Sequence, residues 1–257
     1  MTAVTVVGQH ALVTGGARGI GAAITQRLRA QGCRVTVLGR SAAPGQALAE
    51  QDPDGICAVT ADVADAGQLA QAVDQARRRF GPIALLVNNA GQAESAAFLK
   101  TDAALWQRML DVNLTGTMLC TQAVLPDMLQ AGWGRVINVA STAGQTGYAY
   151  VSAYCAAKHG VIGLTRALAR ELAATGVTVN AVCPGYTDTD LVRESLARIV
   201  SRTGRDEATA RAELVKTNPQ GRLIDPAEVA DAVAWLCGPG AGAVTGQTIS
   251  VSGGEVM

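Results

Sequence analysis

Residues 11–21 read Ala-Leu-Val-Thr-Gly-Gly-Ala-Arg-Gly-Ile-Gly. The apolar start predicts a short buried strand, the glycines predict a tight turn, and the Ala- and Leu-containing run that follows predicts a helix ending near Gly32. This order is the context of a dinucleotide-binding turn, because backbone N–H groups at the N-terminus of a helix can approach a pyrophosphate. The spacing Gly15-x-x-x-Gly19-x-Gly21 departs from GxGxxG, so the turn alone is also compatible with an ordinary loop.

The end of the second predicted strand, residues 34–38, bears on which dinucleotide would bind. A site for NAD usually places an acidic residue there, about 20 residues past the first glycine, to accept from the ribose 2′-OH. This chain has Gly39 and then Arg40, and Arg18 lies in the glycine turn. Two guanidinium groups suit a 2′-phosphate, which predicts NADP(H), with NAD(H) as the alternative. The other interpretation is that both arginines are solvated loop residues.

Strand and helix patterns alternate along the chain without a linker-like break, which predicts one domain over residues 1–257. The predicted fold class is α/β, a single-domain Rossmann fold with a doubly wound parallel sheet of about seven strands and helices on both faces. Asp225 and Pro226 predict the start of a late helix, as N-cap and first helical residue. A polar, Arg-rich segment at about 188–221 is predicted to be a substrate lid. Further strands are predicted at residues 56–60, 83–87, 135–140, 177–182 and 247–251, and further helices at 65–80, from near 106 to about 130, and at 154–174.

Composition limits the function classes. The 257 residues carry 21 basic and 21 acidic side chains, so the net charge of zero gives no sign of a nucleic-acid surface. The six cysteines are scattered without CxxC spacing and only two histidines are present, which predicts reduced thiols and no metal site. The N-terminal residues lack the basic and apolar regions of a signal peptide, and no apolar run reaches transmembrane length. We therefore expect a cytoplasmic protein with no nucleic-acid or membrane partner.

A second motif lies between Ser141 and Lys158. Ser141 follows an apolar strand, and the carboxyl ends of strands are where open α/β sheets bind ligands. Tyr154 and Lys158 are four residues apart in a predicted helix, so the phenol and the ammonium share a face. A cation beside a phenol favours the phenolate, so we expect a lowered pKa for Tyr154 and a usable proton donor near neutral pH. The alternative is an ordinary helix that carries a Tyr and a Lys one turn apart.

Six motifs follow one another along the chain: Thr14-Gly15-x-x-x-Gly19-x-Gly21, Asn88-Asn89-Ala90-Gly91, Asn113, Ser141, Tyr154-x-x-x-Lys158 and Pro184-Gly185. Together they resemble the short-chain dehydrogenase/reductase family over essentially the whole chain. The resemblance implies a Rossmann fold, a homotetramer or homodimer, and reversible hydride transfer between a nicotinamide and a carbonyl/alcohol pair. Cys155 departs from the family pattern, in which Ser is usual. The cofactor-binding residues that the resemblance implies are Gly15, Arg18, Gly19, Ile20, Gly21, Arg40, Asp62, Val63, Asn89, Ala90, Gly91, Tyr154, Lys158, Pro184, Gly185 and Thr187.

The resemblance also implies a catalytic tetrad of Asn113, Ser141, Tyr154 and Lys158. Ser141 would hydrogen-bond the substrate oxygen while Tyr154 donates its proton as hydride arrives from the nicotinamide. Lys158 would hold the ribose hydroxyls and depress the tyrosine pKa. Asn113 would fix a water that links Lys158 to solvent, so that the proton can be replaced.

The sequence looks closest to the 3-oxoacyl-thioester reductase branch of the family, which includes acyl-carrier-protein and polyketide ketoreductases. Residues 180–185 and 238–247 support this placement. It implies a thioester substrate and, as partner, coenzyme A or an acyl carrier protein. Tyr148 and Tyr150 could line the substrate pocket. The arginines of the lid either meet the phosphates of such a partner or form a solvated helical face; they are Arg193, Arg198, Arg202, Arg205 and Arg211.

Two alternatives stay open. The first is an NAD-dependent dehydrogenase of a hydroxyacyl-CoA or of a cyclic or aromatic alcohol. The second is a protein that only senses NADP(H) or serves as an assembly partner. The intact tetrad argues against the second alternative, because nothing would require all four groups together in a protein without catalysis.

Overall fold

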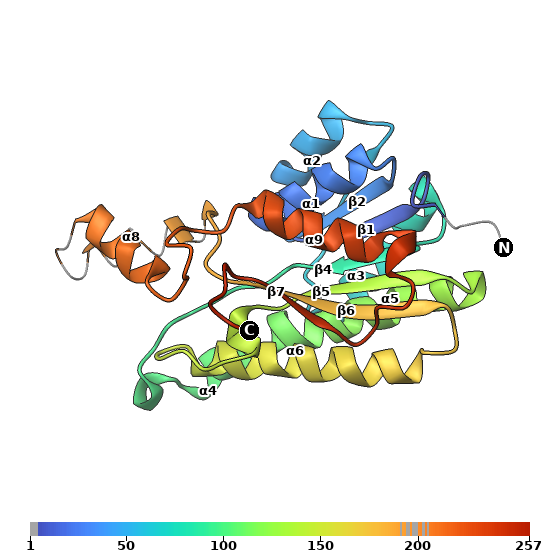
Figure 1. Ribbon diagram of the computed structural model, residues 1–257. Helices are drawn as coiled ribbons and strands as arrows, with labels where there is room; N and C mark the ends of the chain where they lie inside the picture. The colour runs from blue at the N-terminus through green and yellow to red at the C-terminus, as the bar shows by residue number, and fades with distance from the viewer. Residues whose placement is uncertain (1–4, 191, 194–195, 197–199, 202–203, 205) are drawn as a thin grey trace.

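Seven parallel strands form a single sheet at the centre of the structure (Figure 1). This computed structural model describes residues 5–190, 192–193, 196, 200–201, 204 and 206–257. The strand order β3-β2-β1-β4-β5-β6-β7 changes direction between β1 and β4, which is the switch point where open α/β sheets bind ligands. The strands are β1 (His10–Thr14), β2 (Arg34–Gly39), β3 (Ile56–Thr60), β4 (Leu85–Asn88), β5 (Gly134–Val139), β6 (Val177–Pro184) and β7 (Thr248–Val251).

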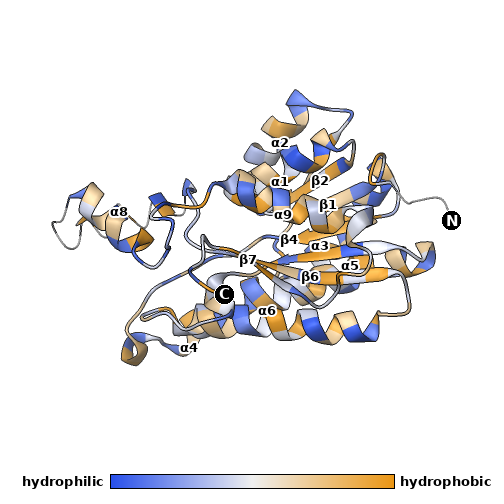
Figure 2. Cartoon of the chain, in the orientation of Figure 1, coloured by the Kyte–Doolittle hydropathy of each residue, from blue (hydrophilic) through white to orange (hydrophobic). Residues whose placement is uncertain are grey.

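Helices cover both faces of the sheet. One apolar cluster packs α1, α2 and α9 against it, and a second packs α3, α5 and α6 against the other face. Figure 2 shows apolar residues concentrated along the strands between these layers, and Figure 1 shows α8 standing apart from them. The helices are α1 (Gly19–Ala30), α2 (Ala42–Gln51), α3 (Ala66–Phe80), α4 (Ala103–Leu110), α5 (Gly116–Ala131), α6 (Ser152–Glu171), α8 (Glu207–Val215) and α9 (Pro226–Cys237), with short turns η1 (Phe98–Lys100), η2 (Asp111–Thr115), η3 (Thr142–Gly144) and η4 (Pro239–Ala241).

The predicted α/β fold class is confirmed, and every predicted strand is present with ends that differ by at most two residues. The helix predicted from near residue 106 to about 130 is confirmed as a continuous helical run from Ala103 to Ala131, in which the π turn η2 lies between α4 and α5. Helix α2 has no clear sequence pattern, since Pro44 and Gly45 lie in its first turn. In the described part of the chain, no helix has the length and apolar character needed to cross a membrane.

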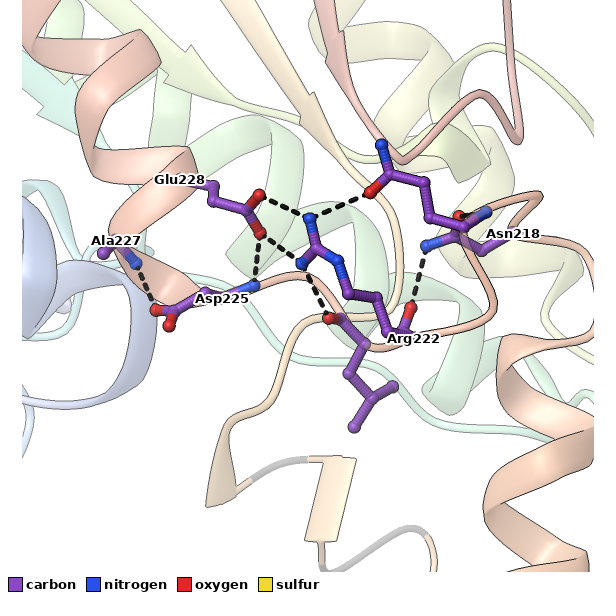
Figure 3. A network of polar contacts seen from close by, with 7 residues as sticks. Asn218, Arg222, Asp225, Ala227 and Glu228 are labelled. Atoms are coloured by element: carbon purple, nitrogen blue, oxygen red, sulfur yellow. Dashed lines mark hydrogen bonds and ion pairs between the residues drawn. The ribbon is translucent and has the colours of Figure 1, made fainter.

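The N-terminus of α9 is fixed by a polar network (Figure 3). Asp225 accepts from the backbone N–H of Ala227 at 2.8 Å, and Glu228 accepts from that of Asp225 at 2.8 Å, which forms the capping box. Arg222 donates to both carboxylate oxygens of Glu228 at 2.6 and 2.7 Å, and this contact lowers the pKa of Glu228 to about 2. Asn218 donates to the Arg222 carbonyl at 2.8 Å. The network anchors the chain at the start of α9, just beyond the segment predicted to be a lid.

His10 is buried at the end of β1 that lies away from the glycine turn. Its Nδ1 lies 2.8 Å from the Gly81 carbonyl oxygen, which can only accept, so Nδ1 carries the proton. Nε2 then accepts from the Thr36 hydroxyl at 2.8 Å. Burial lowers the pKa of His10 below its ordinary value, so the folded protein holds this histidine neutral.

We expect His10 to make the protein less stable in acid. The unfolded chain takes up a proton at the ordinary histidine pKa of about 6.5, whereas folded His10 resists protonation to a lower pH. Its contribution to the free energy of unfolding is therefore complete above about pH 6.5 and is lost as the pH falls toward the lowered pKa. In His10→Gln this decline should be shallower, and stability at about pH 8 should fall by about 1–3 kcal/mol because Gly81 and Thr36 lose a partner.

Urea unfolding at several pH values measures both effects. The matched control is His159→Gln, which changes the other histidine, an exposed residue on α6. A His10→Gln protein whose stability declines with acid as steeply as the wild type would contradict this account of His10.

Candidate active site

A π turn places Asn113 in the interior of the protein. The wider turn η2 directs this side chain inward, where it is 1% exposed. Its Nδ2 donates to the carbonyls of Gln92 and Met109 at 3.0 and 2.9 Å, and its Oδ1 accepts from the backbone N–H of Gln92 at 3.2 Å. Such π turns are frequent at functional sites. Asn113 thereby fixes the segment that follows β4.

The glycine turn after β1 is bound to the end of β4. The Thr14 hydroxyl oxygen accepts from the backbone N–H groups of Asn89 and Ala90 at 3.0 and 2.9 Å. Asn89 Nδ2 donates to the carbonyls of Thr14 and Gly15 at 3.0 and 3.3 Å. Gly15 has φ +65°, and a Cβ at Gly21 would lie 2.1 Å from the Gly15 carbonyl oxygen. Only glycine permits this close approach of the backbone at the switch point.

A pocket of about 270 Å³ opens beside this turn. Arg18 and Arg40 lie on its wall with exposed side chains, and neither forms an ion pair with a described residue. Gly39 stands at the end of β2, where a carboxylate would otherwise meet a ribose. The pocket is lined by Gly15, Ala17, Arg18, Leu38, Gly39, Arg40, Ser41, Pro44, Ala61, Asp62, Val63, Ala90, Gly91 and Val112.

The other predicted cofactor residues do not line this pocket. Gly19, Ile20 and Gly21 form the first turn of α1. Asn89 supports the glycine turn from behind. At the end of β6, beyond Pro184, the backbone N–H of Gly185 donates to the Val251 carbonyl at 3.1 Å, and the buried Thr187 hydroxyl donates to the Gly185 carbonyl at 3.0 Å.

Ser141, Tyr154 and Lys158 come together at the carboxyl end of β5. Ser141 follows this strand closely, and its Oγ accepts from the Ala143 N–H at 3.1 Å. Tyr154 and Lys158 stand one turn apart in α6, with Lys158 Nζ 5.7 Å from the centre of the Tyr154 ring. Lys158 is 5% exposed, and its Nζ donates to the Val139 carbonyl at 2.8 Å. The shared face predicted from the four-residue spacing is confirmed.

Gly91 joins Asn113 to this group. A Cβ at Gly91 would lie 2.9 Å from Asn113 Oδ1 and 3.7 Å from Lys158 Nζ. Gly91 also lines the pocket beside the glycine turn. The four residues of the predicted tetrad therefore share one region, next to the pocket.

The expected lowering of the Tyr154 pKa is wrong. Part of the Tyr154 side chain reaches the surface, yet burial raises its pKa to about 12, and the neighbouring Ser141 side chain opposes this only in part. Burial also lowers the pKa of Lys158 to about 8. In both groups removal from water is the largest cause of the shift, because it disfavours the charged form. Near neutral pH the pair is a protonated phenol beside a mostly protonated amine.

No sequence motif points to Glu255, which the tertiary structure brings to this region. Its carboxylate accepts from Tyr148 Oη at 2.7 Å and from Thr217 Oγ1 at 2.6 Å. Tyr148 lies 2.9 Å from the hydroxyl oxygen of Thr142, the residue after Ser141. A single glutamate near a chain end has no spacing or flanking pattern that could have announced this contact.

The sequence predicted a place in the substrate pocket for Tyr150 and phosphate contacts for the arginines of the predicted lid. Tyr150 is 70% exposed with φ 68°. Arg193 pairs with Asp188 and Asp190 at 3.2 and 3.0 Å, so its charge is already balanced. Arg211 is exposed on α8, and a phosphate contact by it stays a prediction. Three of the predicted lid residues lie outside the described residues: Arg198, Arg202 and Arg205.

The chain is similar to known proteins over almost its whole length. The sequence profile described as short chain dehydrogenase matches residues 9–199. A 3-oxoacyl-[acyl-carrier-protein] reductase from Synechocystis sp. is 40% identical over 262 residues, which cover 100% of each chain. A cis-4-hydroxycyclohexanecarboxylate dehydrogenase from Sinomonas cyclohexanicum is 41% identical over 248 residues, or 95% of each chain. The crystal structure of a variant of actinorhodin polyketide ketoreductase with NADPH matches with a TM-score of 0.92 and 38% identity, covering 96% of this chain and 97% of that one.

We expect Asn113→Ala to destabilise the protein by about 1–3 kcal/mol, because Gln92 and Met109 lose the partner of buried backbone groups. Thr117→Val is the matched control, since it removes only one hydrogen bond of 3.0 Å to the Asn113 carbonyl and should cost about 0.5–1.5 kcal/mol. Urea denaturation of both variants measures the difference. Equal stability of Asn113→Ala and the wild type would mean that the π turn does not depend on this side chain.

Proposed function

This chain belongs to the short chain dehydrogenase family, and we propose that it is an NADP(H)-dependent oxidoreductase that reduces a 3-oxoacyl thioester to a 3-hydroxyacyl thioester. One observation carries the proposal: Ser141, Tyr154 and Lys158 converge beside a pocket that holds Arg18 and Arg40. The first three residues can hydrogen-bond and protonate a carbonyl oxygen, and the two arginines can bind a phosphorylated dinucleotide.

The residues of the pocket fit NADP(H). Gly15 and Gly21 let the backbone approach the pyrophosphate, and Arg18 and Arg40 would hold the 2′-phosphate in a region where Gly39 replaces a carboxylate. When bound, the cofactor supplies the hydride that the carbonyl carbon receives. Further residues proposed to contact it are Gly19, Ile20, Asp62, Val63, Asn89, Ala90, Gly91, Tyr154, Lys158, Pro184, Gly185 and Thr187.

The protonated state of Tyr154 suits the role of proton donor. A pKa of about 12 keeps the phenol protonated near neutral pH, which is the state that a proton donor to a carbonyl oxygen needs. Oxidation of an alcohol would require the deprotonated phenol as base. Ser141 would donate a hydrogen bond to the same substrate oxygen.

Replacement of the donated proton is the role we propose for Lys158 and Asn113. Lys158 would bind the ribose hydroxyls, and its ammonium would pass a proton toward Tyr154. Asn113 Oδ1 accepts one hydrogen bond, from the Gln92 N–H, and an amide oxygen can accept two. The second acceptor position would hold a water near Gly91 and Lys158.

The substrate assignment rests on the kinship with a 3-oxoacyl-[acyl-carrier-protein] reductase and with a polyketide ketoreductase. We propose an acyl carrier protein or coenzyme A as the carrier of the thioester, and a homotetramer or homodimer in the cytoplasm. All six cysteines are free thiols, as in proteins of a reducing compartment.

A dehydrogenase of a cyclic secondary alcohol is the second candidate, favoured by the relative that acts on cis-4-hydroxycyclohexanecarboxylate.

Steady-state kinetics with paired substrates distinguishes the candidates. We expect the highest kcat/KM for acetoacetyl-CoA or the acetoacetyl thioester of N-acetylcysteamine with NADPH. A preference for cis-4-hydroxycyclohexanecarboxylate with NAD⁺ would establish the second candidate instead. Tight NADPH binding without turnover of any carbonyl or alcohol would support a sensing protein.

We expect Tyr154→Phe to lower kcat by at least about 100-fold, because proton donation contributes that much to carbonyl reduction. NADPH affinity, followed by fluorescence of the bound nicotinamide, should change by less than about threefold since the ring and Lys158 remain. Tyr150→Phe removes an exposed phenol from the same chain segment and serves as control. Substantial turnover by Tyr154→Phe would remove the role assigned to its hydroxyl.

We expect Arg40→Ala and Arg18→Ala each to raise KM for NADPH by about 10–100-fold, the value of a charged hydrogen bond to phosphate. KM for NADH, which lacks the 2′-phosphate, should stay within about threefold. Arg34→Ala, at the opposite end of β2, removes the same charge from an exposed position as control. Equal losses for NADPH and NADH would place the arginines elsewhere than at the 2′-phosphate.

A further inference from the structure

The carboxylate of Glu255 connects three segments of the chain. It lies in the C-terminal tail beyond β7 and accepts from Thr217, which follows α8 at the end of the lid segment, at 2.6 Å. It also accepts from Tyr148, in the loop between Ser141 and Tyr154, at 2.7 Å. One side chain therefore ties the tail and the predicted lid segment to the loop that lies between two reactive groups, Ser141 and Tyr154.

The same carboxylate faces the ends of β5 and β6. Tyr148 Oη lies 2.9 Å from the Thr142 hydroxyl oxygen, so two hydrogen bonds lead from Glu255 to the neighbour of Ser141. The second carboxylate oxygen, Oε2, lies 2.9 Å from the position of a Cβ at Gly185. Gly185 follows the last residue of β6, the strand next to β5. Glu255 thus stands at the carboxyl edge of the sheet, where a carbonyl held by Ser141 would lie.

The negative charge of Glu255 is not neutralised by a described side chain. Its hydrogen-bond donors are the neutral hydroxyls of Tyr148 and Thr217, and no Lys or Arg of the described chain forms an ion pair with it. After burial, the Glu255 charge is a further cause of the raised pKa of Tyr186. The field of the carboxylate therefore reaches Tyr186, in the segment that follows β6.

We propose that Glu255 is a positioning and specificity residue of the ketoreductase: it holds Tyr148 and the end of the lid segment in place, and its charge favours a 3-oxoacyl thioester over the free 3-oxo acid. The proposal rests on the proposed function. In a thioester the acyl group next to the reacting ketone is uncharged, and the phosphates of a carrier lie at the far end of its arm. In the free acid a carboxylate occupies that place. Two carboxylates within about 8 Å of each other would repel enough, at an effective dielectric constant of about 20, for roughly tenfold discrimination or more.

Glu255→Gln separates charge from hydrogen bonding, because glutamine keeps an acceptor oxygen and loses the negative charge. We measure kcat/KM with NADPH for acetoacetate, ethyl acetoacetate and the acetoacetyl thioester of N-acetylcysteamine. The preference of the wild type for the two neutral substrates over acetoacetate should fall roughly tenfold in Glu255→Gln, through faster use of acetoacetate. Lys158 is present in all variants, so its attraction for acetoacetate cancels in this ratio.

Glu171→Gln is the matched control. It makes the same charge change on an exposed residue at the far end of α6, about 25 Å along the helix from Tyr154. Its substrate preference should equal that of the wild type. If Glu255→Gln keeps the wild-type ratio as well, the charge has no part in specificity.

Hydrogen exchange tests the positioning role without turnover. Amides of residues 142–150 and 215–222 should exchange at least about threefold faster in Glu255→Ala, which loses both hydrogen bonds, and at the wild-type rate in Glu255→Gln. Unchanged exchange in Glu255→Ala would overturn the positioning role.

The proposed function fails separately if the wild type reduces ethyl acetoacetate but no thioester, since the ester and the acid still report the effect of Glu255. Absence of turnover with all three substrates would remove both the proposed function and the specificity role.

Discussion

The hydrogen bond from the Lys158 ammonium to the Val139 carbonyl is the contact on which the geometry of the site depends. A buried charge is costly unless it has a polar partner, and Val139 supplies one at 2.8 Å. Because Val139 is the last residue of β5 and Lys158 belongs to α6, the bond fixes the start of this helix against the end of that strand. Ser141 is two residues beyond Val139 and Tyr154 is one turn before Lys158, so both reactive hydroxyls take their places from this contact.

The burial of Lys158 and Tyr154 also determines which protonation state each side chain adopts. Removal from water raises the pKa of Tyr154 to about 12 and lowers that of Lys158 to about 8, and both changes favour the uncharged forms. The protein chain therefore keeps the phenol in its proton-donating state near neutral pH. An argument from the four-residue spacing finds the right two groups but the wrong sign, since the spacing says nothing about how much water surrounds them.

Charges of opposite sign lie on the two flanks of this pair. Arg18 and Arg40 line the pocket beside the glycine turn, where we propose that the phosphorylated dinucleotide binds. Glu255 lies at the ends of β5 and β6, bound only to neutral hydroxyls among the described residues. Positive charge near the cofactor attracts phosphate, and negative charge near the acyl group repels a free carboxylate. This arrangement follows from the sheet, because the carboxyl ends of all its strands meet along one edge.

The sequence by itself determined the order of the strands and of most helices, the glycine turn, and the identity of Ser141, Tyr154, Lys158 and the two pocket arginines, because these depend on local spacing and on residue type. Tertiary structure decided the π turn that directs Asn113 inward, since its hydrogen bonds go to the segment after β4. It also decided the pKa values, which depend on burial by distant segments. The contact between Glu255 and Tyr148 joins residues 107 positions apart, and no local pattern in a chain can encode such a meeting.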